Sequence, residues 1–116
     1  MHRERERPTV SVGGFDIFQE WLDPDAQAGL LDAARAVANA APLITPTTRF
    51  GRPMSVRMTS AGEWGWMAAG GQYHYSQAHP DGSPWPPIPG VLFDIWTQIT
   101  GLERLPDSCL INHYAE

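Results

Sequence analysis

The order of apolar and polar residues predicts short strands combined with two helices. Near the start, Val10 and Val12 alternate with polar residues, and a Gly-Gly pair precedes a second apolar segment that begins at Phe15. This order predicts a strand, a turn and another extended segment. The residues before them are mostly polar, and we expect residues 1–9 to form a mobile tail.

Two segments carry apolar residues at the spacing of a helix. The first starts after Asp23, a residue type that caps helix N-termini, and Pro24 suits the first helical turn. We expect this helix to run to about Ala41, because a proline follows. The second helix should occupy residues 91–99, since Gly101 favours a helix end.

Two other segments have the period of two that is typical of a strand. In residues 54–59 the apolar side chains, among them Met58, fall on one face and the polar ones on the other, which predicts a half-buried strand. Residues 108–114 form a second strand-like run. Between them lie a glycine-broken stretch at 62–71 and a proline-rich loop at 80–89. Long loops in small domains often carry function.

The size and composition of the chain suit a single globular domain. With 116 residues, 42% hydrophobic and 18% charged, it has room for one modest core. We predict a mixed α+β fold in which two helices pack on a small antiparallel sheet. No apolar run is long enough to span a bilayer, so we expect no membrane association and a cytoplasmic location. The single cysteine, Cys109, fits a small core position.

Charge is distributed unevenly along the chain. The net charge of -5 argues against a protein that binds nucleic acid mainly by bulk electrostatics. Residues 48–80, however, carry a net charge of +2, whereas the segments on either side are acidic. This basic segment also contains most of the aromatic residues considered next.

An aromatic cluster is predicted in this middle segment. If residues 72–76 are extended, Tyr73 and Tyr75 share one face and His74 lies on the other, while Trp66 lies shortly upstream. Aromatic planes on a strand can stack a nucleobase that has left its duplex, and they favour a cationic alkylated base further through cation–π attraction. The alternative is that these residues are ordinary core and loop-anchoring aromatics.

The last strand offers a second group of polar side chains. Leu110, Asn112 and Tyr114 share one face, and His113 lies on the other. An amide beside a phenol can hydrogen-bond a small dicarboxylate. The alternative is a polar strand edge that faces solvent.

A metal site is the third hypothesis. His79-Pro80-Asp81 has the H-x-D spacing of an iron triad, and His74 or His113 would have to complete it. Because the tripeptide lies in a proline- and glycine-rich loop, we expect a solvated turn instead.

Five short segments resemble the bacterial AlkB family of Fe(II)/2-oxoglutarate-dependent dioxygenases, in the family's order and near its spacing: residues 54–59, 65–66, 73–76, 84–86 and 109–115. The similarity covers residues 45–116 well and the preceding helix loosely. It implies that residues 10–116 form the family's N-terminal nucleotide-recognition lid and the start of the dioxygenase core. That start would be the first strand of a double-stranded β-helix, or jelly roll, which would be incomplete.

The resemblance implies a function in the direct repair of alkylation damage. Members of the family remove methyl groups oxidatively from N-alkylated bases in DNA or RNA, with Fe(II) and 2-oxoglutarate as cofactors. The expected partner is single-stranded or flipped-base DNA, or RNA. By position, Trp66, Tyr73 and Tyr75 resemble the lid residues that hold the damaged base, with His74 between the tyrosines, and Met58 matches the strand that lines the lid.

The cosubstrate residues are matched in part. Asn112 and Tyr114 resemble the pair that hydrogen-bonds 2-oxoglutarate, Leu110 shares their face, and His113 stands where the family often has Arg. In the family the iron-binding H-x-D follows soon after this strand, whereas the sequence ends at Glu116. We therefore expect no catalytic residue, no metal ligand and no demethylation from this chain alone.

Two further expectations follow from this interpretation. The alternative function is a non-catalytic module that binds nucleic acid by base stacking. An unpaired last strand would leave an open sheet edge, through which we expect self-association.

Overall fold

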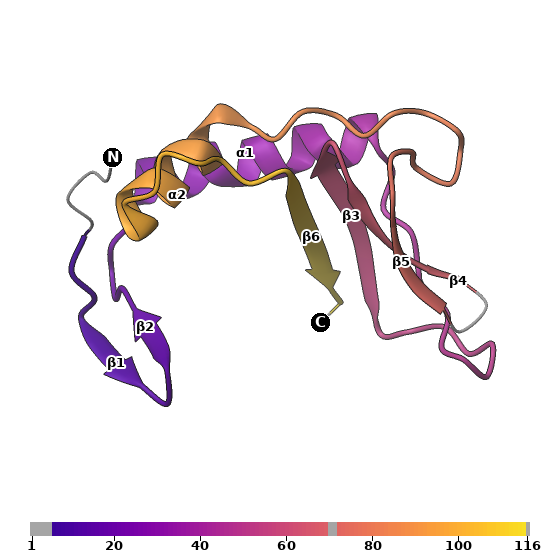
Figure 1. Ribbon diagram of the computed structural model, residues 1–116, viewed down its shortest axis with the longest axis horizontal. Coiled ribbons are helices and arrows are strands. Elements are labelled where there is room, and N and C mark those ends of the chain that lie inside the picture. Colours follow the sequence, from indigo (N-terminus) through magenta and orange to yellow (C-terminus); the bar gives the residue numbers. More distant parts are fainter. Residues whose placement is uncertain (1–5, 70–71, 116) are drawn as a thin grey trace.

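The computed structural model describes residues 6–69 and 72–115, which form an α+β fold 43 Å long (Figure 1). The elements in chain order are β1 (Val10–Val12), β2 (Phe15–Ile17), α1 (Pro24–Ala40), β3 (Val56–Gly62), β4 (Gly65–Ala69), β5 (Gln72–Ser76), α2 (Gly90–Thr100) and β6 (Ser108–Tyr114). In the described ranges the strands form three antiparallel pairs, β1–β2, β3–β6 and β4–β5. The predicted α+β class with antiparallel strands is confirmed, but the described strands form three two-stranded sheets where one small sheet was predicted.

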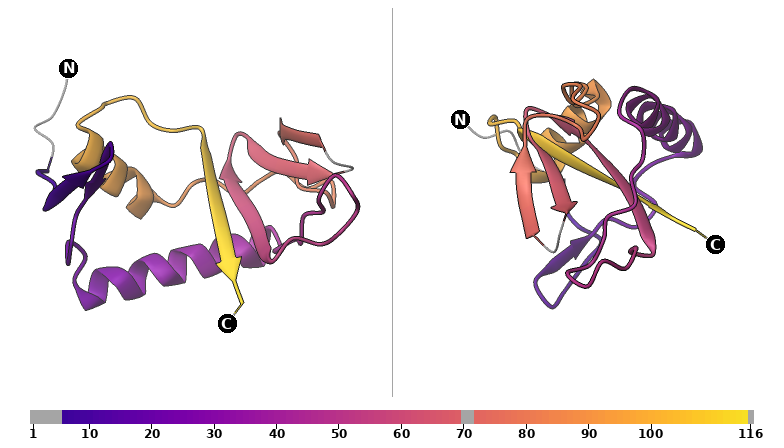
Figure 2. Two further views of the ribbon diagram at one scale, coloured as in Figure 1. Left: turned by 90° about the horizontal axis from the view of Figure 1, so that it is seen from below. Right: turned by 90° about the vertical axis from the view of Figure 1, so that its right-hand side faces the viewer.

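The arrangement of the elements explains why β1–β2 does not join the other strands. Helix α1 runs along the long axis, with the β1–β2 hairpin near one end and the β4–β5 hairpin at the other (Figures 1 and 2). The β3–β6 pair lies between the two hairpins. The helix thus separates β1–β2 from the other strands.

The first hairpin confirms the predicted strand, turn and extended segment. Gly13 and Gly14 have φ angles of 57° and 83°, and two positive angles in succession suit a tight hairpin turn. Residues of the expected tail from Glu6 onward are hydrogen-bonded: the Glu6 N–H donates to the Gln98 carbonyl, and the Thr9 N–H to that of Ile17. Residues 1–5 lie outside the described residues.

Helix α1 forms where the sequence predicts it. The Asp23 carboxylate accepts a hydrogen bond from the Ala26 N–H at 2.8 Å, and Pro24 occupies the first turn. The helix ends at Ala40, as the following proline requires. Helix α2 likewise ends before Gly101, whose φ of 69° is the left-handed conformation that glycine adopts readily.

In the β3–β6 pair, strand β3 differs from its prediction in where it begins and in how much of it is buried. Strand β3 begins later than residue 54, and its residues 58–61 are all buried. The expected solvent-facing position of Thr59 was wrong, because its hydroxyl donates at 2.7 Å to the carbonyl of Ala41, where α1 ends. The polar side chain is buried with its hydrogen bond satisfied.

The last strand is paired along its whole length. From Ser108 to Tyr114 each residue of β6 is opposite one of β3, so the expectation of an unpaired last strand was wrong. Within the described ranges the other edge of β6 has no strand partner. Self-association through that edge stays a prediction.

The core is small, as a short chain requires. Val37 of α1, Ala61 of β3 and Ile88 form its buried centre, and half-buried side chains of α2 and β6, including Cys109, pack around them. Burial raises the pKa of the Cys109 thiol, which keeps it protonated at neutral pH. No described helix has the length and apolar composition that crossing a bilayer requires.

Trp85 joins the proline-rich loop to the β4–β5 hairpin. Its indole N–H donates to the Ser76 carbonyl at 2.8 Å, and its ring packs against Gly65, the residue opposite Ser76 in the hairpin. A β-carbon at position 65 would overlap the indole ring. Trp85 is 6% exposed and therefore belongs to the interior of the protein.

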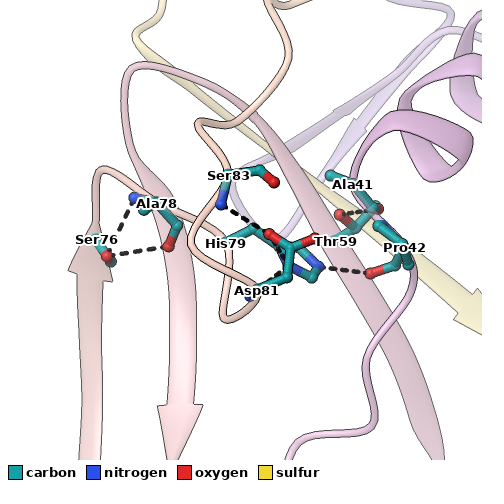
Figure 3. Close-up of polar contacts among 8 residues, drawn as sticks. All are labelled: Ala41, Pro42, Thr59, Ser76, Ala78, His79, Asp81 and Ser83. Atoms are coloured by element: carbon teal, nitrogen blue, oxygen red, sulfur yellow. Dashed lines mark hydrogen bonds and ion pairs between the residues drawn. The ribbon is translucent and has the colours of Figure 1, made fainter.

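His79 ties the same loop to the end of α1 (Figure 3). Its Nε2 donates to the Pro42 carbonyl at 2.8 Å, and its Nδ1 accepts from the Asp81 N–H at 3.1 Å. The edge of the imidazole meets the Trp85 ring at a centroid distance of 5.3 Å. The expectation of a solvated turn was wrong for His79, which is 6% exposed.

Asp81 completes this turn from the solvent side. Its carboxylate accepts from the Ser83 N–H at 2.8 Å and lies 3.2 Å from the Nδ1 of His79. Hydrogen bonds from Ser83 are the main reason why the pKa of Asp81 is lowered.

Gly65→Ala should destabilise the fold by about 1–3 kcal/mol, because the added methyl group overlaps the Trp85 ring. Urea unfolding followed by tryptophan fluorescence measures the change. Gly29→Ala is the matched control: no atom lies within 4 Å of its added β-carbon, and it should stabilise α1 by about 0.5–1 kcal/mol. Equal effects of the two substitutions would contradict the packing described here.

His79→Ala should cost about 1–3 kcal/mol, since it leaves the Pro42 carbonyl and the Asp81 N–H without their partner. The same unfolding experiment measures it. His74→Ala, at an exposed position on β5, should change stability by less than about 0.5 kcal/mol. A His79 variant as stable as the His74 variant would show that these two hydrogen bonds contribute nothing to stability.

Candidate functional site

The β4–β5 hairpin presents three aromatic side chains on one face. Trp66 is opposite Tyr75, and Ala68 is opposite Tyr73, so these four residues point to the same side of the strand pair. The rings of Trp66 and Tyr73 are stacked at a centroid distance of 5.3 Å with 23° between their planes. Tyr73 and Tyr75 are 62% and 60% exposed. The predicted common face is confirmed, and it is open to solvent.

Residues 65–69 of the glycine-broken stretch form a strand, and Gly70 and Gly71 lie outside the described residues. The hairpin strands are paired from Gly65 to Ala69, and the Trp66 N–H donates to the Ser60 hydroxyl of β3 at 3.3 Å. Trp85 fixes the other strand through Ser76. The aromatic face is therefore held by two neighbouring parts of the fold.

The structure separates two other predicted residues from this face. His74 is opposite Met67 and points to the other side of the hairpin, as the strand period required. Met58 lies on β3 and is 4% exposed, so it has little surface to offer a ligand in this arrangement. Their predicted contacts with a base stay predictions.

Strand β6 carries the second predicted group. The Asn112 amide donates to the Tyr114 hydroxyl at 3.3 Å, which confirms that the two side chains share a face. Leu110 and Tyr114, both exposed, flank Asn112 on that face. An amide N–H and a phenol O–H in this position can both donate to one carboxylate group, so the pair suits an oxygen-rich anionic ligand.

His113 lies on the opposite face of β6, as predicted. Its Nδ1 accepts a hydrogen bond from the Arg57 guanidinium at 3.2 Å, across the β3–β6 pair. Arg57, one of the arginines of the basic segment, is therefore already hydrogen-bonded within the protein.

The described residues do not fit a metal ion. They contain no group of three His, Cys, Asp or Glu side chains that could hold one. Both ring nitrogens of His79 are used within the fold, and the Nδ1 of His113 is used by Arg57. The metal hypothesis based on His79 and Asp81 therefore finds no support in the geometry.

The two groups are connected through β3. Ser60 of β3 binds the Trp66 backbone and is opposite Leu110, the neighbour of Asn112 on its face of β6. Strand β3 therefore contacts both the hairpin that carries the aromatic face and the strand that carries the polar face.

Sequence reasoning missed Trp64 and Asp107. Together with Tyr75 and Ser108 they line an open cleft of about 420 Å³ beside the aromatic face. The available signal was the spacing of Trp64 and Trp66, which puts both on the same side of an extended segment. Asp107 carried no such signal, because it joins the cleft through tertiary structure.

Comparison with known proteins shows the family to which the chain belongs. The model of the 2OG-Fe(II) oxygenase superfamily matches residues 14–116. An alpha-ketoglutarate-dependent dioxygenase AlkB homolog of Caulobacter vibrioides is 42% identical over 111 residues, which is 95% of this chain and 50% of the relative.

Two further relatives are named alpha-ketoglutarate-dependent dioxygenase AlkB. The Salmonella typhimurium protein is 36% identical over 95 residues, 78% of this chain and 44% of the relative. The Escherichia coli protein is 34% identical over 84 residues, 68% of this chain and 39% of the relative. The chain thus spans about half the length, or less, of the curated relatives it matches. It belongs to the 2OG-Fe(II) oxygenase superfamily, and its similarity to AlkB proteins confirms the resemblance seen in its sequence.

Proposed function

We propose that this chain supplies the base-recognition surface and part of the 2-oxoglutarate site of an oxidative demethylase that acts on N-alkylated bases in DNA or RNA. The observation that carries the proposal is the exposed aromatic face of β4–β5, with Trp66 stacked on Tyr73 and Tyr75 beside them. The names of the relatives, alpha-ketoglutarate-dependent dioxygenases, support the reaction class.

The aromatic face would bind the damaged base by stacking. Because Tyr73 and Tyr75 are more than half exposed, a base can reach their rings once it has left its own stack, which favours single-stranded or flipped-base substrates. Alkylation of a ring nitrogen makes the base cationic, and the electron-rich ring faces then attract it more strongly than an unmodified base. Selectivity for the lesion would follow from this difference in charge.

Stacking would have to supply most of the affinity. The chain has a net charge of -5, so its overall field opposes a polyanion. The basic residues of the middle segment are partly engaged within the protein, with Arg57 bound to His113 and Arg49 over the Phe50 ring. In this proposal the nucleic acid is therefore recognised mainly through its bases.

Asn112 and Tyr114 would donate hydrogen bonds to a carboxylate of 2-oxoglutarate. Both side chains are exposed on one face of β6, and the apolar Leu110 beside them can contact the methylene groups of the ligand. In an AlkB-type demethylase, bound iron would activate dioxygen, one atom of which would oxidise 2-oxoglutarate to succinate and carbon dioxide while the other would oxidise the methyl group, which would leave the base as formaldehyde. Since the described residues do not fit iron, no step at the metal is assigned to them.

The alternative is a non-catalytic module that binds nucleic acid by base stacking. The exposed face of β4–β5 suffices for that function without any cofactor. Calorimetric titration of the chain with 2-oxoglutarate and with an oligonucleotide containing 1-methyladenine separates the two functions. Binding of both ligands favours part of a demethylase, and binding of the oligonucleotide without 2-oxoglutarate favours the module.

Trp66→Ala should weaken binding of a short single-stranded oligonucleotide containing 1-methyladenine about tenfold, since a base–aromatic stack contributes roughly 1–3 kcal/mol. Fluorescence anisotropy of a labelled oligonucleotide measures the affinity. Phe15→Ala is the matched control, because it removes an aromatic ring that is 75% exposed on β2, outside the site, and it should leave the affinity unchanged. Equal losses in both variants would count against the assigned face.

Asn112→Asp should lower the affinity for 2-oxoglutarate at least about tenfold, because it places a negative charge where a carboxylate is expected to bind. Isothermal titration of the chain with 2-oxoglutarate measures this. Asn39→Asp makes the same charge change at an exposed position of α1 and should have no effect. The assignment fails if the parent chain takes up no 2-oxoglutarate or if the two variants bind it equally.

A further inference from the structure

A second aromatic surface adjoins the face of β4–β5. The open cleft of about 420 Å³ between the start of β6 and the hairpin has Trp64 and Tyr75 as aromatic walls and Asp107 and Ser108 as polar walls. Trp64 is 36% exposed and Tyr75 60%, so both rings have free surface for a ligand. This volume lies within the range of small-molecule sites.

The backbone around the cleft is fixed by hydrogen bonds. The Asp107 carbonyl accepts from the N–H groups of Glu63 and Trp64 at 3.0 and 3.3 Å, and the Gly62 N–H donates to the Pro86 carbonyl at 2.8 Å. Gly62 has a φ of 112°, which favours glycine at this bend. The cleft is thus formed before any ligand arrives, which lowers the entropic cost of binding.

The lining residues select the chemistry of the occupant. Two aromatic rings favour a flat, unsaturated ring, and the Asp107 carboxylate accepts hydrogen bonds from amino groups. A phosphate group would be repelled by Asp107 and by the neighbouring Glu63, which is exposed. The occupant is therefore expected to be a planar ring with an amino group, such as adenine or cytosine, rather than the backbone of a nucleic acid.

Tyr75 connects this cleft to the proposed lesion site. It lines the cleft and is also opposite Trp66, whose ring is stacked on Tyr73. Two aromatic surfaces that share one residue can receive two successive bases of a single strand. We infer that the cleft formed by Trp64, Tyr75, Asp107 and Ser108 binds the base next to the alkylated one; this inference rests on the proposed function of the aromatic face.

The test compares two ligands of different length: 1-methyladenosine monophosphate, and a trinucleotide with 1-methyladenine between two adenines. Trp64→Ala should lower the affinity for the trinucleotide about tenfold and leave the affinity for the mononucleotide unchanged, whereas Trp66→Ala should lower both affinities. Trp64→Phe, which keeps an aromatic wall, should restore most of the trinucleotide affinity. Asp107→Asn should reduce the preference for flanking adenines over flanking thymines.

The outcomes separate the inference from the proposal on which it rests. If Trp66→Ala leaves both ligands unaffected, the lesion site itself is misassigned. Suppose instead that Trp66→Ala lowers the affinity for both ligands, while Trp64→Ala changes neither affinity or lowers both equally. That result overturns the second subsite and leaves the first one standing. Unchanged mononucleotide binding by the Trp64 variant also shows that the variant is folded.

Discussion

The packing of Trp85 against Gly65 is the interaction on which the rest of the site depends. It requires a residue without a side chain at position 65, and it directs the indole N–H to the Ser76 carbonyl on the partner strand. A two-stranded sheet is marginal in water unless another element packs on it. Trp85 provides that support for β4–β5, and His79 connects the support to the end of α1. The buried Trp85 thereby supports the hairpin that carries the exposed Tyr73 and Tyr75 rings.

The buried Trp85 stabilises the hairpin, and this allows a small protein to keep other aromatic side chains exposed. Trp85 is almost fully buried, whereas Tyr73 and Tyr75 remain open to solvent. Large exposed apolar groups bring no stability to the folded chain, and their presence is typical of a binding surface. Trp85 lies close in sequence to Tyr73 and Tyr75, but its side chain is buried and theirs are exposed.

The sequence predicted the elements whose signals are local. Asp23 and Gly101 marked helix ends, the Gly-Gly pair marked a hairpin, and the period of two put Tyr73 and Tyr75 on one face. The features that were missed depend on distant partners. His79 is buried because it contacts Pro42 and Trp85. Thr59 is buried because its hydroxyl bonds the carbonyl of Ala41 at the end of α1. Asp107 lies beside Trp64 through a backbone hydrogen bond between segments that are distant in the sequence. No local pattern reports such contacts.

The strand pairing has a thermodynamic consequence for β4–β5. Because this hairpin is a separate pair rather than part of a larger sheet, its opening need not disrupt the β3–β6 pair. A ligand that binds only the closed hairpin shifts the balance toward closure by the free energy of its binding. Occupation of the preformed site would therefore stabilise the closed hairpin, and amide exchange along β5 would become slower.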